Sequence, residues 1–355
     1  MKGPAPAAAG HGNVAYSNAS VNGGVIERES EHATDECVIV FYIVSGYDIS
    51  GRRAMGTEIA GRVCVTGASG QAGRAVVREL LEHGYEVAAT DLAATRDDLE
   101  AGMLRADLTD YGQALQALEG TETVVHLANI PAPGLSTPAV TFNANVAMNF
   151  NVFYAAARLG LRRVVWASSE TTLGVPFGVG PNEVRFMEAE GVAPRYAPVD
   201  EDHYPVATAT YALSKVASET IARQIAQWSG MPFVALRFSN IFVSSEYSEL
   251  PSIWSDPHAR KWNLWGYVDA RDVGAACRLA LEAPAEAVAG SPSFVIAAAD
   301  TVMNRPSPAL LEEVFPGVPL TRELGEFDSL LASDRARQAI GYEPQHSWRD
   351  HLSAS

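Results

Sequence analysis

The stretch VTGASGQAGRAVV, residues 65–77, decides the fold, because it ends a short apolar run in glycine and then takes on helical spacing. Gly67, Gly70 and Gly73 fall between the predicted strand and the predicted helix, where glycine allows a tight turn and a close approach to a pyrophosphate. The first N–H groups of a helix lack partners within it, and with the helix dipole they attract an anion. This context predicts a dinucleotide-binding turn.

Asp91 is the second half of this signal, since it ends the next predicted strand about 20 residues farther along. A carboxylate there accepts hydrogen bonds from a ribose diol and repels a 2′-phosphate, which favours NAD over NADP. Two alternatives remain: a structural turn with a surface aspartate, and NADP binding helped by the nearby Arg96.

Strand-like and helix-like segments alternate from Arg62 to Asn240. The strand-like runs are almost continuously apolar, as expected of parallel strands buried on both faces. Right-handed crossovers turn this alternation into a doubly wound α/β fold of the Rossmann type, with a parallel sheet. The predicted strands are 62–67, 85–91, 123–129, 162–169 and 232–240, and the predicted helices are 73–84, 109–120, 145–160 and 210–229.

The chain divides into three predicted regions. Residues 1–58 are rich in Ala, Gly, Asn and Ser without a period, and we interpret them as a disordered or loosely packed N-terminal extension. Residues 59–240 form the predicted NAD-binding Rossmann domain. Residues 241–355 form a smaller predicted substrate-binding region, with a strand at 293–298 and helices near 269–282, 309–314 and 333–340. We expect the fold not to need the residues before Met55.

Composition argues against several classes of partner. The chain has 355 residues, 47% of them hydrophobic, and a formal net charge of −16, so its surface repels nucleic acid and anionic lipid. No apolar run reaches the roughly 18 residues of a membrane helix, which predicts no membrane partner.

The three cysteines have no CxxC spacing, which favours a reducing, cytoplasmic location. The eight histidines show no metal-ligand spacing, so no metal is expected.

The stretch TYALSKVASE, residues 210–219, predicts the chemistry. Tyr211 and Lys215 are neighbours on one helical face. A free phenol has a pKa of about 10, and an adjacent ammonium lowers it, so the tyrosine could exchange a proton near neutral pH. The lysine could also bind the nicotinamide ribose. The alternative is a surface helix with a neutral ring and a solvated ammonium.

Other side chains are expected at the same sheet edge. Ser168 and Ser169 end a predicted strand, where a hydroxyl could hold the substrate oxygen while the tyrosine moves the proton. Asp107 could accept from the adenine amino group, and Ala128 is small enough to let the cofactor pass. Both could instead be ordinary residues at strand ends.

Taken together, TGASGQAG, Asp91, Asp107, HLAN, WASSETTLG, YALSK and RFSN resemble the extended short-chain dehydrogenase/reductases of the NAD-dependent epimerase/dehydratase family. The resemblance runs from about Arg62 to the segment 330–348. It implies Ser169, Tyr211 and Lys215 as catalytic residues, and Ser169, Glu170 and Asn240 as substrate-binding residues. The implied cofactor-binding residues are Gly67, Ser69, Gly70, Gln71, Ala72, Gly73, Asp91, Asp107, Leu108, Leu127, Ala128, Asn145, Ser168, Tyr211 and Lys215. In this comparison Asn145 opens a helix. The family also implies a homodimer that pairs through helices 145–160 and 211–229.

Two departures from the family pattern bear on the substrate. Nucleotide-sugar enzymes of this family often read Arg-Asp-aromatic-Ile-His-Val, and the matching stretch 264–273 has Trp265 and Gly266 where the diphosphate-binding Arg-Asp pair would be. Candidate replacement cations are Arg237, Arg260, Lys261 and Arg271. Dehydratases carry an Asp-Glu pair after the catalytic Thr, whereas Ser169 is followed by Glu170 and Thr171.

These features lead to one function with two alternatives. The leading prediction is an NAD-dependent oxidoreductase that acts on a hydroxyl of a carbohydrate-like small molecule, a sugar or sugar derivative, by Ser-Tyr-Lys chemistry. The first alternative is a nucleotide-sugar epimerase with tightly bound NAD, which would return the hydride to the other face of the sugar. The second is a non-catalytic NAD-binding sensor.

Overall fold

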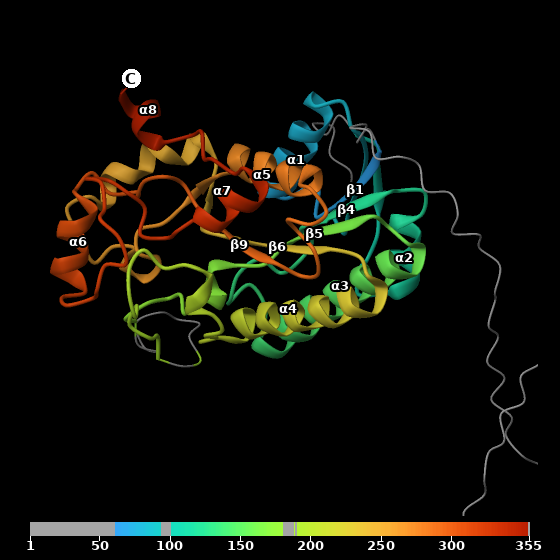
Figure 1. Ribbon diagram of the computed structural model, residues 1–355, viewed down its shortest axis with the longest axis horizontal. Helices are drawn as coiled ribbons and strands as arrows, with labels where there is room; N and C mark the ends of the chain where they lie inside the picture. Colours follow the sequence, from blue (N-terminus) through green and yellow to red (C-terminus); the bar gives the residue numbers. More distant parts are fainter. Residues whose placement is uncertain (1–60, 94–100, 180–187, 189, 354–355) are drawn as a thin grey trace, which may run out of the picture. The chain divides into compact units, whose positions relative to one another are not determined.

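A seven-stranded parallel sheet forms the centre of the fold, with the strand order β3-β2-β1-β4-β5-β6-β9 (Figure 1). Its strands are β1 (Arg62–Thr66), β2 (Glu86–Asp91), β3 (Met103–Arg105), β4 (Thr123–His126), β5 (Arg163–Ala167), β6 (Phe233–Phe238) and β9 (Ser293–Ile296). The order reverses between β1 and β4, which creates a crevice at the carboxyl ends of these strands. This confirms the predicted doubly wound α/β fold.

The computed structural model describes residues 61–93, 101–179, 188 and 190–353, which belong to the unit Thr57–Ser355. The predicted N-terminal extension, residues 1–58, and Arg96 lie outside the described residues. Within Thr57–Ser355, β9 adds to the same sheet as β1–β6, so the predicted C-terminal region supplies one strand of the central sheet.

Helices cover both faces of the sheet (Figure 1). One layer contains α1 (Gln71–Glu82), α5 (Ala270–Glu282) and α7 (Asp334–Ile340), and the other contains α2 (Tyr111–Leu118), α3 (Pro138–Leu159) and α4 (Thr210–Ser229). The remaining elements are α6 (Ser307–Val314), α8 (Trp348–Ser353), the short strands β7 (Ile241–Phe242) and β8 (Val268–Asp269), and the 3₁₀ segments η1 (Glu170–Thr172), η2 (Glu201–His203), η3 (Ser244–Ile253) and η4 (Lys261–Asn263).

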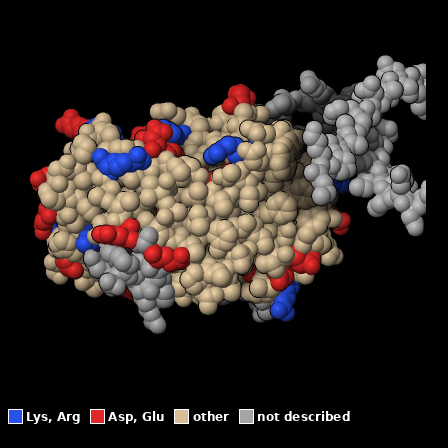
Figure 2. Space-filling view, turned by 90° about the horizontal axis from the view of Figure 1, so that it is seen from below, with Lys and Arg blue, Asp and Glu red and all other residues tan. Residues whose placement is uncertain are grey.

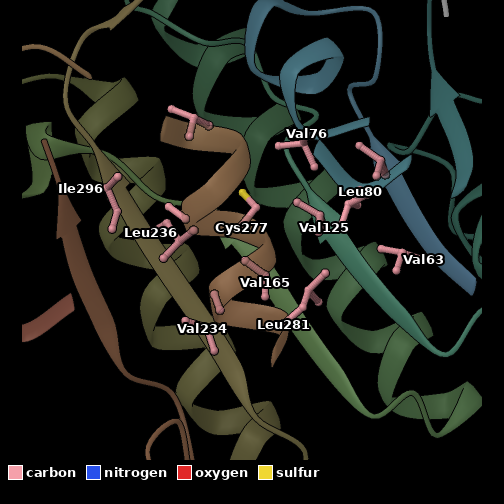
Figure 3. Close-up of a cluster of buried hydrophobic side chains, with 14 of the residues drawn as sticks. Val63, Val76, Leu80, Val125, Val165, Val234, Leu236, Cys277, Leu281 and Ile296 are labelled. Carbon is pink, nitrogen blue, oxygen red and sulfur yellow. The ribbon is translucent and has the colours of Figure 1, made fainter. Parts of the chain in front are cut away.

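The continuous apolar strands are explained by burial on both faces. Val63, Val125 and Val165 pack under α1 and α5, where Cys277 fills the space between them (Figure 3). Their neighbours along the strands belong to a second cluster under α2, α3 and α4, which includes Cys64, Val124, Val164 and Phe233. Successive residues of a strand point to opposite faces, so both sets must be apolar.

One helix begins earlier than predicted. The helix expected at 145–160 is α3, which starts at Pro138 after the extended residue Thr137. Proline is favoured in the first turn of a helix because its missing N–H would have no partner there. The prediction that Asn145 opens the helix is therefore wrong, because Asn145 lies about two turns inside it.

The stretch that departs from nucleotide-sugar enzymes is part of a third hydrophobic core. Trp265 is fully buried, and its indole N–H donates to the Pro257 carbonyl at 3.0 Å. A Cβ on Gly266 would lie 2.6 Å from Leu331 Cδ1, so a side chain at this position would have to displace the end of Leu331. Of the two residues that stand in place of the Arg-Asp pair, Trp265 therefore fills space in the core and Gly266 lets its neighbours approach closely.

Candidate active site

The glycine turn is packed too closely for any other residue at two of its positions. A Cβ on Gly67, which has a φ of +68°, would lie 2.7 Å from the backbone nitrogen of Ala128. A Cβ on Gly73 would lie 2.1 Å from the Gly67 carbonyl oxygen, so this glycine lets α1 approach β1. Gly70 caps α1 and offers no side-chain acceptor to its first N–H groups. These groups fit the pyrophosphate of a dinucleotide.

Asp91 lies beside this turn. One of its carboxylate oxygens accepts from the Ser69 N–H at 2.9 Å, and the other accepts from the Ala93 N–H at 3.0 Å. Both bonds hold the carboxylate at the carboxyl edge of β1 and β2, where a ribose diol can reach it.

Asp107 comes two residues after β3 and organises a turn. One of its oxygens accepts from the Thr109 hydroxyl at 2.7 Å and from the Thr109 N–H at 2.9 Å, and these bonds lower the pKa of Asp107. Leu108 is buried in the core beneath α2 and α3. In these contacts Asp107 and Leu108 shape the loop at the end of β3.

Strand β4, which pairs with β1, also meets the glycine turn at its carboxyl end. The Leu127 and Ala128 N–H groups donate to the Thr66 hydroxyl at 3.1 and 3.2 Å, and Ala128 is the residue that approaches Gly67. At the start of α1, the Gln71 amide donates to Glu246 of η3 at 3.0 Å. Ala72 packs against the core under α1 and α5.

Tyr211 and Lys215 lie one turn apart in α4, as predicted, and both are buried. The Lys215 ammonium lies 5.7 Å from the centroid of the Tyr211 ring. It donates to the Ala167 carbonyl at 2.8 Å and to the Asn129 side-chain oxygen at 3.0 Å. Ser169, just after β5, hydrogen-bonds the Tyr211 hydroxyl. The structure therefore brings the three predicted catalytic side chains together.

The predicted effect of the lysine on the tyrosine is wrong in this structure. Burial raises the pKa of the Tyr211 hydroxyl to about 12; the hydrogen bond from Ser169 opposes this rise, and the charge of Glu170 adds to it. Burial also lowers the pKa of Lys215 to about 7, although the nearby Glu219 favours its charged form. Helical spacing predicts that the two groups are neighbours, but burial is the largest cause of both pKa shifts, and it disfavours the charged form of each group.

A buried polar network holds Lys215, and sequence reasoning missed it. Asn129 donates to the Asn149 side-chain oxygen at 2.9 Å, and the same oxygen lies 2.8 Å from His126 Nε2. The other ring nitrogen of His126 lies 2.7 Å from the Thr66 hydroxyl. Burial lowers the pKa of His126 to about 3, so this ring is neutral at physiological pH. The polar residue that ends the HLAN stretch, Asn129, was the sequence feature that could have indicated this network.

Asn145 holds the segment that follows β4. Its side chain accepts from the Ile130 N–H at 2.8 Å and donates to the Ile130 carbonyl at 3.1 Å. Asn145 also donates weakly to Ser214 of α4 at 3.4 Å. In this structure its contacts are with the protein's own backbone and α4.

Ser168 belongs to a buried ion pair. Its hydroxyl donates to Glu219 at 2.7 Å, and Arg237 donates to both oxygens of Glu219 at 2.9 Å. Glu219 lies four residues after Lys215 on α4, so the spacing of Tyr211, Lys215 and Glu219 along one helical face could have revealed it.

Glu170 is buried directly after Ser169, with both carboxylate oxygens hydrogen-bonded. Ser239 donates to it at 2.6 Å and Asn263 donates at 3.3 Å. The backbone N–H of Asn240 also bonds to it, while the Asn240 carbonyl accepts from Val268 at 3.0 Å. Burial raises the pKa of Glu170 to about 7.

The candidate replacements for the missing arginine differ in their contacts. Arg237 is paired with Glu219, and Arg271 forms two bonds of 2.8 Å with Asp269. Arg260 lies against the rings of Phe242 and Trp262, 5.1 Å from each centroid, and its buried Nε has no hydrogen-bond partner among the described residues. Among Arg237, Arg260 and Arg271, Arg260 is thus the one with a buried, unpaired donor atom, while its Nη2 donates to the Gly266 carbonyl at 3.3 Å.

No helix in the described part of the chain is long and apolar enough to cross a bilayer. No three His, Cys, Asp or Glu side chains within these residues are arranged to hold a metal ion.

Comparison with family models identifies the class. Residues 63–297 match the model of the NAD dependent epimerase/dehydratase family, and the chain belongs to this family. The predicted resemblance, the enzymatic class and the NAD dependence are therefore confirmed at the level of the family.

The individual relatives described next are each less than 30% identical to this chain. The chain is 28% identical to cinnamoyl-CoA reductase 1 of Petunia hybrida over 282 residues, which cover 73% of this chain and 78% of the relative. It is 29% identical to L-arabinose 1-dehydrogenase (NAD(P)(+)) of Haloferax volcanii over 192 residues, which cover 53% and 70%. A short-chain dehydrogenase/reductase superfamily protein from Agrobacterium tumefaciens, solved with bound NAD, has the same fold, with a TM-score of 0.60, 23% identity, and coverage of 82% and 95%.

Proposed function

We propose that this protein is an NAD-dependent oxidoreductase that acts on a hydroxyl group of a sugar or sugar derivative. One observation carries the proposal: contacts run without interruption from the glycine turn to the tyrosine. Gly67 packs on Ala128, the next residue Asn129 accepts from Lys215, and the Lys215 ammonium lies near the Tyr211 ring. A cofactor bound at the turn would bring its nicotinamide toward this group.

Each catalytic residue has one role in this proposal. NAD, when bound, supplies the hydride acceptor. Ser169 orients the reacting oxygen, and Tyr211 takes the hydroxyl proton during oxidation or returns it during reduction. An ammonium has three N–H donors, and Lys215 directs two of them to Ala167 and Asn129, so the third can bind the nicotinamide ribose.

The cofactor site in this proposal joins the glycine turn to the strand ends beside it. The N–H groups that open α1 bind the pyrophosphate, and Asp91 binds the adenosine ribose. Asp107 and Ala128 line the path of the cofactor, with Leu108, Leu127 and Asn145 supporting the loops around it. The carboxylate of Asp91 favours NAD over NADP.

The substrate class is supported by two observations. The L-arabinose 1-dehydrogenase relative is named for the oxidation of a free sugar. The buried Trp265 and the crowded Gly266 leave no diphosphate-binding pair at this place, which argues against a nucleotide sugar. Asn240 would contact the sugar in this proposal. The family name keeps the epimerase reaction as the second candidate.

The test is a substrate panel with NAD. L-Arabinose, D-galactose, D-glucuronate and UDP-galactose are each incubated with the protein, and NADH is followed by absorbance while sugar isomers are resolved by chromatography. A steady rise in NADH with a free sugar or uronate supports the dehydrogenase. Isomerisation of UDP-galactose without net NADH favours the epimerase. No turnover with any of them contradicts the proposed substrate class.

A homodimer through α3 and α4 is part of the proposal. Figure 2 shows a broad uncharged surface on the side of the sheet where these helices lie. Phe150 and Tyr154 stack there with ring centroids 5.6 Å apart, and Leu213 and Trp228 are exposed on α4. Exposed apolar patches of this kind are typical of protein interfaces. Light scattering of the intact chain and of Phe150→Glu should show a dimer and a weakened dimer, and a monomeric wild type contradicts this.

A reducing location in the cell is also part of the proposal, and the state of the cysteine thiols supports it. Cys64 and Cys277 are free and buried, which supports a reducing compartment such as the cytoplasm.

A further inference from the structure

One hydrogen bond joins the start of α1, just after the glycine turn, to a segment 175 positions farther along the chain. The Gln71 side-chain amide donates to Glu246 of η3 at 3.0 Å. The same Glu246 oxygen accepts from the Val243 N–H at 2.7 Å, and this second bond orients the carboxylate. Both Gln71 and Glu246 are partly buried, so the contact is sheltered from bulk water.

The segment η3 is anchored by contacts that do not involve the glycine turn. The Tyr247 hydroxyl, next to Glu246, donates to Asp269, the residue that caps α5. Helix α5 packs closely on α1 at Gly274, where a Cβ would lie 3.0 Å from the Ala75 carbonyl oxygen. These contacts set the position of Glu246 relative to α1, so Gln71 meets an acceptor that is already in place.

The sheet topology places this bond at the cofactor crevice. Gln71 follows β1, whereas η3 follows β6 and β7, and both β4 and β5 lie between β1 and β6 in the sheet. Neighbouring strands are about 4.8 Å apart, so the ends of β1 and β6 are separated by roughly 14 Å. The chain from Ser239 to Glu246, closed by the bond to Gln71, therefore crosses the sheet edge beside the ends of β4 and β5.

The catalytic group approaches this edge from the opposite layer. Tyr211 and Lys215 belong to α4, which covers the other face of the sheet from α1 and α5 (Figure 1). A cofactor that runs from the glycine turn toward Tyr211 would therefore have α4 on one side and the bond between Gln71 and Glu246 on the other.

We propose that Gln71 and Glu246 form a clasp over the cofactor crevice, which opens to admit NAD and opens again to release NADH. The clasp is closed in the free protein and closes again in the complex. A contact that is equally strong in both states slows entry and release together and leaves the dissociation constant unchanged. This proposal rests on the proposed cofactor site and does not depend on the identity of the substrate.

The test measures how fast NADH binds and leaves. Stopped-flow fluorescence follows energy transfer from the protein, which has 6 tryptophans, to NADH. Gln71→Ala and Glu246→Ala each remove one partner of the bond. We expect the association and dissociation rate constants both to rise about 5-fold, while Kd stays within about 2-fold of the wild-type value. The double variant should be no faster than the single variants, because both substitutions remove the same bond.

Two controls separate the bond from charge. Glu246→Gln keeps an acceptor oxygen of the same reach but removes the charge, so its rate constants should stay near those of the wild type. Glu249→Gln removes an exposed carboxylate from η3 and should change neither rate constant.

Three results would overturn the clasp. The first is wild-type rate constants in both Gln71→Ala and Glu246→Ala, and the second is additive effects in the double variant. The third is faster release with an equal loss of affinity, because this result identifies a direct contact with the cofactor. NADH binding needs no substrate, so a failed sugar panel would count against the proposed function alone.

Discussion

Lys215, a catalytic residue in the proposed function, is expected to destabilise the fold near neutral pH. Burial lowers its pKa from the ordinary 10.5 to about 7, so between these values the unfolded chain holds a proton that the folded chain has lost. The free energy of unfolding is therefore lowest below about pH 7 and rises as the pH increases toward 10.5. The full pKa shift corresponds to about 5 kcal/mol in the free energy of unfolding.

Lys215→Met removes this titration. The substitution also strands the Ala167 carbonyl and the Asn129 oxygen, but that cost does not change with pH. The free energy of unfolding of Lys215→Met, relative to wild type, should therefore fall by about 3 kcal/mol when the pH is raised from about 7 to about 9.5.

Urea unfolding of both proteins at the two pH values measures this difference. Arg223→Met, which removes an exposed charge from the same helix α4, is the matched control and should show no such change. A Lys215→Met difference that stays constant with pH to within about 0.5 kcal/mol would refute the reasoning, because it would mean that Lys215 keeps its proton in the folded chain.

Other substitutions test single buried contacts. Arg163→Met removes the guanidinium that donates to three carbonyls at the end of α5, and the free energy of unfolding in urea should fall by about 3 kcal/mol; an unchanged midpoint contradicts this. Arg237→Met leaves Glu219 buried without its partner and should cost about 3–5 kcal/mol in the same assay, more than Arg223→Met. Gly73→Ala places a Cβ against the carbonyl at the start of the glycine turn, so calorimetry should detect no NAD binding, and wild-type affinity would be contrary evidence.

The sequence predicts the fold well where the signal is local. The middle residues of the central strands are apolar because both of their faces are buried, as for Cys64 and Val65 in β1. The helix predicted at 210–229 is α4 with the same bounds. The start of α3 was misplaced by about two turns, since the Thr137–Pro138 signal for a helix start was overlooked.

Long-range contacts are what the sequence could not predict. Tyr211 and Lys215 are recognisable because they lie one turn apart, but the donors around Glu170 come from residues about 70 and 90 positions away, at Ser239 and Asn263. The pKa of Tyr211 depends on its burial, which a helical pattern does not reveal. Asn129 binds Lys215 only because β4 and α4 meet in the folded chain.

Tyr211→Phe tests the proposed chemistry most directly. The variant keeps the ring but has no proton to exchange, so it should bind NAD as tightly as wild type while NADH formation, with the substrate that the panel identifies, falls by about 100-fold or more. Wild-type turnover in this variant, with NAD still bound, would contradict the assignment of Tyr211 as the acid and base.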